Sequence, residues 1–157
     1  MGFLKTNAVR ILESKNNSHS IIEYQSNEDE IDAVSVANKI GAPPETVFKT
    51  LVARNDRNEI IVFVIPGNFE LNLKKAAKSS GSKNIELIKV KELQPLTGYI
   101  RGGCSPIGMK KLFRTFIDES AQLYGKIYCS AGARGIQVNL SPSDLVLLVD
   151  ACFADLI

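Results

Sequence analysis

The chain has 157 residues, of which 45% are hydrophobic and 23% are charged, and its formal net charge is +2. This size and balance are typical of one globular domain with its own core, so we expect a single domain over residues 1–157. The small net charge disfavours a strongly basic nucleic-acid binder, and no apolar run approaches the roughly 20 residues that a membrane-spanning helix needs. The segment Met1–Lys5 lacks the apolar stretch of a signal peptide, so we expect a cytoplasmic protein that does not bind a membrane.

The composition also argues against metal chemistry. The three cysteines are odd in number and show no C-x-x-C spacing, which indicates neither a disulfide framework nor a zinc site. With one histidine, His19, a histidine-based metal site is equally unexpected. We therefore predict that the protein uses no metal and no cofactor.

Charged residues are unevenly distributed along the chain. Five acids and no base lie between Glu23 and Asp32, whereas the segment Lys74–Lys91 holds six lysines and only one acid, Glu86. Both segments can simply be solvated faces. The alternative is that the basic segment attracts a polyanion.

The first third of the chain alternates helices with a strand. The expected elements are a helix over 7–15, a strand over 20–25, a helix over 33–40 and a single helical turn over 43–45. Apolar residues recur at helical spacing after Thr6, which can cap the first helix. Asp32 can cap the second helix, and Gly41 is typical of its C-terminal end.

A β-hairpin follows, with strands over Phe48–Ala53 and Glu59–Ile65 and a polar connection over Arg54–Asn58. Strand alternation places Lys49 on the same face as Leu51. If that face is the inner one, the ammonium needs an anion or a carbonyl as partner. The alternative is an edge lysine whose side chain extends to water.

The remaining elements again include paired strands. We expect a helix over 73–80, strands over 85–88 and 114–118, a hairpin of 127–130 with 136–140, and a helix over 144–149 that begins after a Ser-Pro-Ser-Asp capping sequence. Irregular interleaving of helices with hairpin-like strand pairs favours an α+β fold with a bent mixed β-sheet flanked by helices.

The segment Arg101–Gly108 is the strongest candidate for a ligand-binding loop. It holds three glycines, a serine and a proline, so its backbone can approach a ligand closely and present N–H groups to it. Ser105 does not lie in a G-x-S-x-G nucleophile motif, because Pro106 follows it, and His19 is far away in sequence. Cys104 has no histidine partner to activate it. The remaining interpretation is a loop whose backbone amides bind an ester or a carbonyl group.

Three segments carry a family resemblance: Val47–Leu51 with the sequence V-F-K-T-L, Leu96–Gly108 with R-G-G-C-S-P-I-G at its end, and Ile127–Gly135. Together they resemble the YbaK/EbsC family, free-standing relatives of the editing insertion domain of bacterial prolyl-tRNA synthetase. The match runs in order from about Asn7 to Ile157. The F-K-T-L segment and the G-G-x-S-P-x-G loop are specific in combination and much less so alone.

The resemblance implies the YbaK fold and trans-editing: release of cysteine from mischarged Cys-tRNA(Pro), and from Cys-tRNA(Cys), with the thiol of the substrate attacking its own ester. It implies catalytic roles for Lys49, Tyr24 and Gly102. It implies substrate contacts for Thr50, Tyr99, Gly103, Ser105, Pro106, Ser130 and Gln137. The implied partner is the acceptor end of an aminoacyl-tRNA, and two alternatives stay open: the protein acts alone or docks on prolyl-tRNA synthetase. Lysines of the basic segment, with Lys110, Lys111 and Arg114, would contact phosphates.

Two residues depart from the family pattern. Gln137 stands where many members carry an acid, and Cys104 stands where an aliphatic residue is usual. Two alternatives therefore stay open: an Ala-tRNA(Pro) deacylase of the neighbouring subfamily, and a non-catalytic module that binds an amino acid or an aminoacyl-adenosine end.

Overall fold

The structure is a computed structural model that describes residues 5–157; Met1–Leu4, most of the segment considered for a signal peptide, lies outside the described residues. The helices are α1 (Asn7–Ser14), α2 (Ala33–Ile40), α3 (Leu73–Ser80), α4 (Val90–Thr97) and α5 (Pro142–Val149), with short 3-10 helices η1 (Pro44–Thr46) and η2 (Glu119–Leu123). The strands are β1 (Ser20–Glu23), β2 (Phe48–Asn55), β3 (Ile60–Pro66), β4 (Ile85–Leu87), β5 (Arg114–Asp118), β6 (Ile127–Ala133), β7 (Ile136–Leu140) and β8 (Cys152–Ala154).

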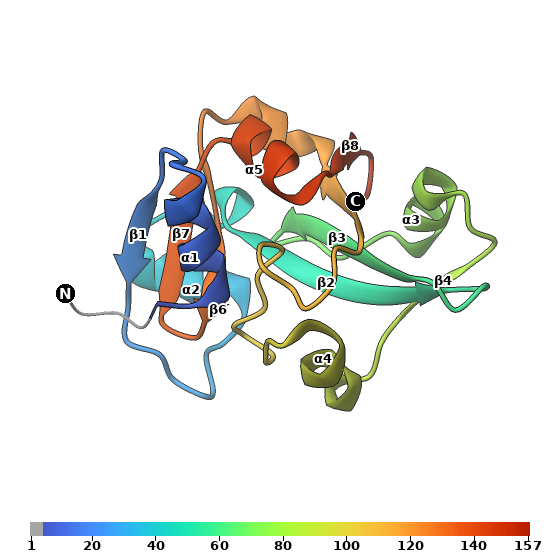
Figure 1. The fold of residues 1–157 in the computed structure, drawn as a ribbon, viewed down its shortest axis with the longest axis horizontal. Coiled ribbons are helices and arrows are strands. Elements are labelled where there is room, and N and C mark those ends of the chain that lie inside the picture. The colour runs from blue at the N-terminus through green and yellow to red at the C-terminus, as the bar shows by residue number, and fades with distance from the viewer. Residues whose placement is uncertain (1–4) are drawn as a thin grey trace.

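The expected α+β class is confirmed, and the strands divide between two sheets (Figure 1). One sheet is antiparallel with the order β1-β7-β6, and the other is mixed with the order β4-β2-β3-β5-β8. A single parallel bridge between Val47 and Tyr128 connects them at the start of β2. Where we expected one bent mixed sheet, the strands thus form two sheets, of which the larger is mixed.

Strand β3 is buried on both faces. Its successive side chains point alternately into two cores. Val62 and Val64 point into the main core, which α1, the three-stranded sheet and α5 complete. Ile61 and Phe63 point the other way, into a second core that α3 and the C-terminal segment cover. A third, small cluster around Val36 lies beneath α2. Strands β3 and β5 therefore form the buried centre of the five-stranded sheet.

Capping side chains fix the predicted helix ends. Thr6 Oγ1 accepts a hydrogen bond from the N–H of Val9, and Asp32 Oδ2 accepts one from the N–H of Ser35. Gly41 ends α2 in the left-handed conformation, with φ +72°. Ser141 caps α5, which begins at Pro142, slightly earlier than expected.

Three elements, α4, η2 and β8, are not predicted from the sequence. Helix α4 carries a lysine at its N-cap position and has Pro95 in its interior, so the usual start signals are weak and the proline argues against a helix. Two contacts of Glu92 hold it in place: the carboxylate accepts a hydrogen bond from the N–H of Lys89 and pairs with Arg54 on β2 at 2.9 Å. The guanidinium of Arg54 is the main cause of the lowered pKa of Glu92.

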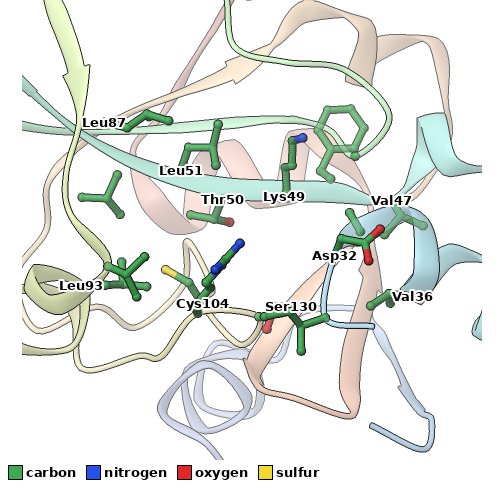
Figure 2. Close-up of a pocket in the computed structure, with 18 of the residues that line it drawn as sticks. Asp32, Val36, Val47, Lys49, Thr50, Leu51, Leu87, Leu93, Cys104 and Ser130 are labelled. Atoms are coloured by element: carbon green, nitrogen blue, oxygen red, sulfur yellow. The ribbon is translucent and has the colours of Figure 1, made fainter. Parts of the chain in front are cut away.

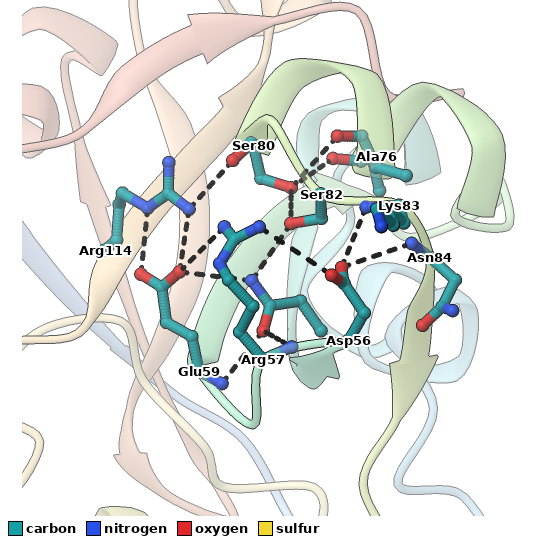
Figure 3. A network of polar contacts seen from close by, with 11 residues as sticks. Asp56, Arg57, Glu59, Ala76, Ser80, Ser82, Lys83, Asn84 and Arg114 are labelled. Atoms are coloured by element: carbon teal, nitrogen blue, oxygen red, sulfur yellow. Dashed lines mark hydrogen bonds and ion pairs between the residues drawn. The ribbon is translucent and has the colours of Figure 1, made fainter.

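A polar network holds the far end of the β2–β3 hairpin (Figure 3). Strand β2 continues to Asn55, whose Oδ1 accepts hydrogen bonds from the N–H groups of Arg57 and Glu59, so the connection is shorter than expected. Arg114 donates to both carboxylate oxygens of Glu59, at 3.1 and 2.9 Å, and to the carbonyl oxygen of Ser80. Arg114 thus ties the hairpin to α3 and β5, and its expected contact with phosphate stays a prediction.

Among residues 5–157, no helix is both long and apolar enough to cross a membrane.

Candidate functional site

A cavity of about 500 Å³ lies along one edge of β2 (Figure 2). Strand β4 pairs only with Ala53–Asn55, and the N–H of Ile88 continues this edge by donating to the carbonyl of Val52. Among the described residues, the preceding stretch Phe48–Leu51 has no strand partner on this side. Backbone groups alternate between the two edges of a strand, so the N–H and C=O of Thr50 point to the same side as those of Val52. Backbone donors and acceptors therefore border the cavity.

Predicted site residues from four segments, which are β2, the glycine-rich loop, β6 and β7, meet at this cavity. The predicted site residues that line it are Lys49, Thr50, Gly102, Ser130 and Gln137. Ser130 and Gln137 lie directly opposite each other in the β6–β7 pair, next to a register shift between Ser130 and Ala133. The cavity thus brings together the F-K-T-L segment, the glycine-rich loop and the second hairpin.

Lys49 and Thr50 extend to opposite sides of β2, as Figure 2 shows. Lys49 is half-buried and lies close enough to Asp32 to influence it. The pKa of Asp32 is lowered mainly by the hydrogen bond from the Ser35 hydroxyl, and the positive charge of Lys49 contributes to the same shift. The ammonium therefore borders the Asp32 end of the cavity. Lys49 also retains access to solvent, so both interpretations of this side chain stay open.

Two polar atoms at the cavity are buried without a hydrogen-bond partner among the described residues: Thr50 Oγ1 and Gln137 Oε1. Gln137 is only 5% exposed. A buried acceptor without a partner costs about 1–3 kcal/mol, so native proteins rarely keep one without a reason. These two oxygens are therefore candidates to accept a hydrogen bond from a ligand in the cavity.

The glycine-rich loop contributes Arg101, Gly102 and Cys104 to the lining. Gly102 has φ +84°, and a Cβ built on it would lie 2.8 Å from Cβ of Ile31, so glycine is required on two grounds. Burial raises the pKa of the Cys104 thiol to about 12. At neutral pH this thiol stays protonated and is a poor nucleophile.

Three other predicted residues of this loop do not line the cavity. Gly103 turns the chain through its N–H, which donates to the carbonyl of Ile100, and a Cβ there would lie 2.9 Å from the backbone nitrogen of Arg134. Ser105 is fully buried, and its Oγ accepts a hydrogen bond from the N–H of Ile107. Pro106 is buried beside it. These residues shape the loop from within.

Both predicted tyrosines also lie outside the lining. Tyr24 borders a second, polar hollow formed with Gln25, Glu30 and Lys39, and its ring packs against the cluster beneath α2. Tyr99 belongs to the main core and donates from its hydroxyl to the carbonyl of Ile107 at 2.6 Å. Burial raises the pKa of Tyr99 to about 12. The family likeness of these positions could not distinguish a core hydroxyl from one that contacts a ligand.

The buried hydrogen bond of Tyr99 gives a stability prediction. Tyr99→Phe is expected to lower the free energy of unfolding by about 1–3 kcal/mol, because it leaves the carbonyl of Ile107 without this donor. Tyr124→Phe, at a half-buried tyrosine outside the cavity, is the matched control and should cost less. Urea unfolding followed by circular dichroism measures both. Equal stability of the two variants would contradict the assigned contact.

Several lining residues were not predicted as site residues. Asp32 was recognised only as a helix cap, although it also lines the cavity. Gly67, which directly follows β3, also lines the cavity; a Cβ there would meet Cβ of Ala33 and would lie 2.7 Å from the carbonyl oxygen of Val47. The turn sequence Pro66-Gly67 is visible in the sequence. The close contact of Gly67 with Ala33 depends on the position of α2, which the sequence does not give. The wall formed by Leu87, Ile88, Lys89, Val90 and Leu93 depends on the unpredicted α4.

In the part of the chain that the structure describes, no three histidine, cysteine or acidic side chains are grouped so that they could hold a metal ion. Cys104 and Cys129 are buried free thiols, and Cys152 is an exposed one.

Comparisons with known proteins point in one direction. A family model for the aminoacyl-tRNA editing domain matches residues 28–148. A protein of Enterococcus faecalis, provisionally named Cys-tRNA(Pro)/Cys-tRNA(Cys) deacylase EbsC, is 47% identical over 152 residues, which cover 97% of this chain and 93% of that protein. The proline–tRNA ligase of Brachyspira hyodysenteriae is 36% identical over 73 residues, 46% of this chain and 13% of the ligase.

A solved structure, provisionally described as a trans-editing enzyme for prolyl-tRNA synthetase, superposes with a TM-score of 0.82. The alignment covers 98% of both chains at 23% sequence identity. At this identity the likeness establishes the fold alone.

Proposed function

The chain belongs to the aminoacyl-tRNA editing domain family, and from this premise we propose that it is a deacylase that releases cysteine from mischarged Cys-tRNA(Pro) and from Cys-tRNA(Cys). The observation that carries the proposal is the convergence of Lys49, Thr50, Gly102, Ser130 and Gln137 on one cavity. The relative of 47% identity with the corresponding name supports the choice of cysteine.

In this proposal the aminoacyl ester lies along the open edge of β2. The ammonium of Lys49 and backbone N–H groups near Thr50 and Gly102 polarise the ester carbonyl, as preorganised donors do in other acyl-transfer sites. Gln137 and Thr50 supply acceptors for the α-amino group of the substrate, because their side-chain oxygens have no other partner among the described residues. Ser130 lies beside them.

The nucleophile in the proposal is the substrate's own thiol. The sulfur attacks the ester carbon, a C–S bond forms, and the C–O bond to the ribose breaks. The ribose oxygen takes up the proton that the thiol lost, so the products are the tRNA and a cysteine thiolactone, which water then opens to cysteine. The cavity contributes mainly by orienting the thiol and by excluding water.

A prediction for Cys104 follows from its protonated thiol. Cys104→Ala is expected to change the rate of cysteine release by no more than about threefold, because a thiol with a pKa of about 12 is not ionised at neutral pH. Single-turnover deacylation of Cys-tRNA(Pro) measures this. A loss of a hundredfold or more would mean that the enzyme's thiol, and not the substrate's, attacks the ester.

The acceptor end of the tRNA is the expected partner surface, and the net charge of +2 gives little affinity for the rest of the tRNA. Prolyl-tRNA synthetase would supply that affinity in a joint complex, in the cytoplasm where aminoacyl-tRNA is used. If so, adding the synthetase lowers the KM for Cys-tRNA(Pro) and leaves the kcat of the deacylase unchanged. An unchanged KM would mean that the synthetase does not help this protein to bind the tRNA.

One experiment separates the candidate functions. The protein is incubated with Cys-tRNA(Pro) and with Ala-tRNA(Pro), and loss of the ester is followed beside a Lys49→Ala control. Release of cysteine supports the proposal. Release of alanine without cysteine would indicate the neighbouring subfamily, and turnover of neither would indicate a binding module.

A further inference from the structure

The cavity has two ends of different chemistry. At one end lie the polar groups of Thr50, Ser130 and Gln137, with the charged side chains of Lys49 and Asp32. The other end is formed by apolar side chains of β4, of the connection that follows it and of α4: Leu87, Ile88, Val90 and Leu93. In Figure 2, Leu87 and Leu93 both lie on the side of the pocket opposite to Asp32.

The size of the cavity exceeds what a cysteinyl group needs. Its volume of about 500 Å³ is in the range of pockets that enclose a whole small-molecule ligand. Cysteine is one of the smallest aminoacyl groups, and the polar end alone offers the groups that it requires. The apolar end is therefore available for another part of the same substrate.

Two apolar side chains at this end of the cavity are also strongly exposed to solvent. Leu87 is 46% exposed and Val90 is 63% exposed. Single exposed apolar side chains are common on protein surfaces, but these two border the same cavity as the partly buried Leu93. A flat apolar group placed on them would remove this surface from water.

Besides Lys49, two further cations border the same cavity. Lys89 directly precedes Val90, and Arg101 comes from the glycine-rich loop. An apolar surface with cations beside it is complementary to a nucleotide, which has an apolar base and a charged phosphate.

We propose that the surface of Leu87, Val90 and Leu93 binds the adenine of the 3′-terminal adenosine that carries the amino acid. The inference rests on the proposed function, because the ester must lie at the polar end for its adenosine to reach this surface. Lys89 and Arg101 then meet the phosphate that connects this adenosine to the rest of the tRNA. The enzyme recognises the nucleoside that every aminoacyl-tRNA shares through α4, and the amino acid through β2 and β7.

The test uses a cysteinyl-adenosine analogue in which an amide replaces the ester, so that it is not cleaved. Calorimetry gives its Kd, together with the Kd of an abasic analogue that lacks adenine. The wild type is expected to bind the adenosine analogue at least about tenfold more tightly than the abasic one. The double variant Leu87→Ser, Val90→Ser should lose this advantage. Leu123→Ser, at a leucine that is 79% exposed and does not line the cavity, is the matched control and should keep it.

The outcomes separate the subsite from the proposed function. Equal affinity of the wild type for the two analogues, or an unchanged ratio in the double variant, would overturn the adenine subsite even if Cys-tRNA is deacylated. A tenfold ratio that the double variant abolishes would support the subsite even if no ester is cleaved, and the absence of cleavage would count against the deacylase function alone.

Discussion

Replacing Lys49 with alanine is expected to slow the release of cysteine from Cys-tRNA(Pro) by about 100- to 1,000-fold, the loss typical of removing one preorganised donor from an acyl-transfer site. The side chain lies on the open edge of β2, lines the cavity and is half-buried. Single-turnover deacylation with saturating enzyme measures the effect on the chemical step.

The control for Lys49 is a variant that keeps the charge. Lys49→Arg retains a cation but presents a planar group of different reach, so it should recover only part of the activity. Thermal unfolding of both variants should stay close to that of the wild type, because Lys49 retains access to solvent. A Lys49→Ala rate within about tenfold of the wild-type rate would exclude a role for this ammonium in polarising the ester.

Replacing Gly102 with alanine is expected to reduce kcat/KM by about a hundredfold, the effect of a misplacement of roughly 1 Å in a catalytic site. The new Cβ would lie 2.8 Å from Cβ of Ile31 and 3.2 Å from Nε of Arg134, so the loop has to shift. The residue also has φ +84°, which costs a non-glycine residue about 1–2 kcal/mol.

Gly81→Ala is the matched control for this substitution. Gly81 ends α3 with φ +67°, and no described atom lies within 4 Å of its built Cβ. Both variants should lose a similar amount of stability from backbone strain, and only Gly102→Ala should lose activity beyond the fraction that unfolds. Unfolding curves and deacylation rates measured on the same preparations separate the two effects. Equal activity of the two variants would contradict a role for the position of the loop.

Local chemistry made much of the fold predictable. Thr6, Asp32 and Ser141 cap the helices that they were expected to cap, because each acts on N–H groups within three residues. The hairpin of β2 and β3 follows from its apolar runs and polar connection. Helix α4 was not predictable in this way, because its position depends on contacts with β2 such as the Arg54–Glu92 pair.

The site was predictable only in part, for a related reason. Lys49, Gly102 and Gln137 are far apart in sequence; the family resemblance grouped them, and in the fold all three line one cavity. The same resemblance grouped Tyr99 and Ser105 with them, although the hydroxyl groups of both residues are engaged within the protein. The apolar wall of the cavity carries no polar motif, so only the three-dimensional arrangement of β4 and α4 reveals it.

The central claim is that this cavity releases cysteine through the substrate's own thiol. The most direct measurement compares Cys-tRNA(Pro) with tRNA(Pro) that carries 2-aminobutyrate, in which a methyl group replaces the thiol at nearly the same size. We predict that the wild type releases cysteine at least about a hundredfold faster, because a well-oriented internal nucleophile is lost with the sulfur. Equal rates for the two esters would contradict the account.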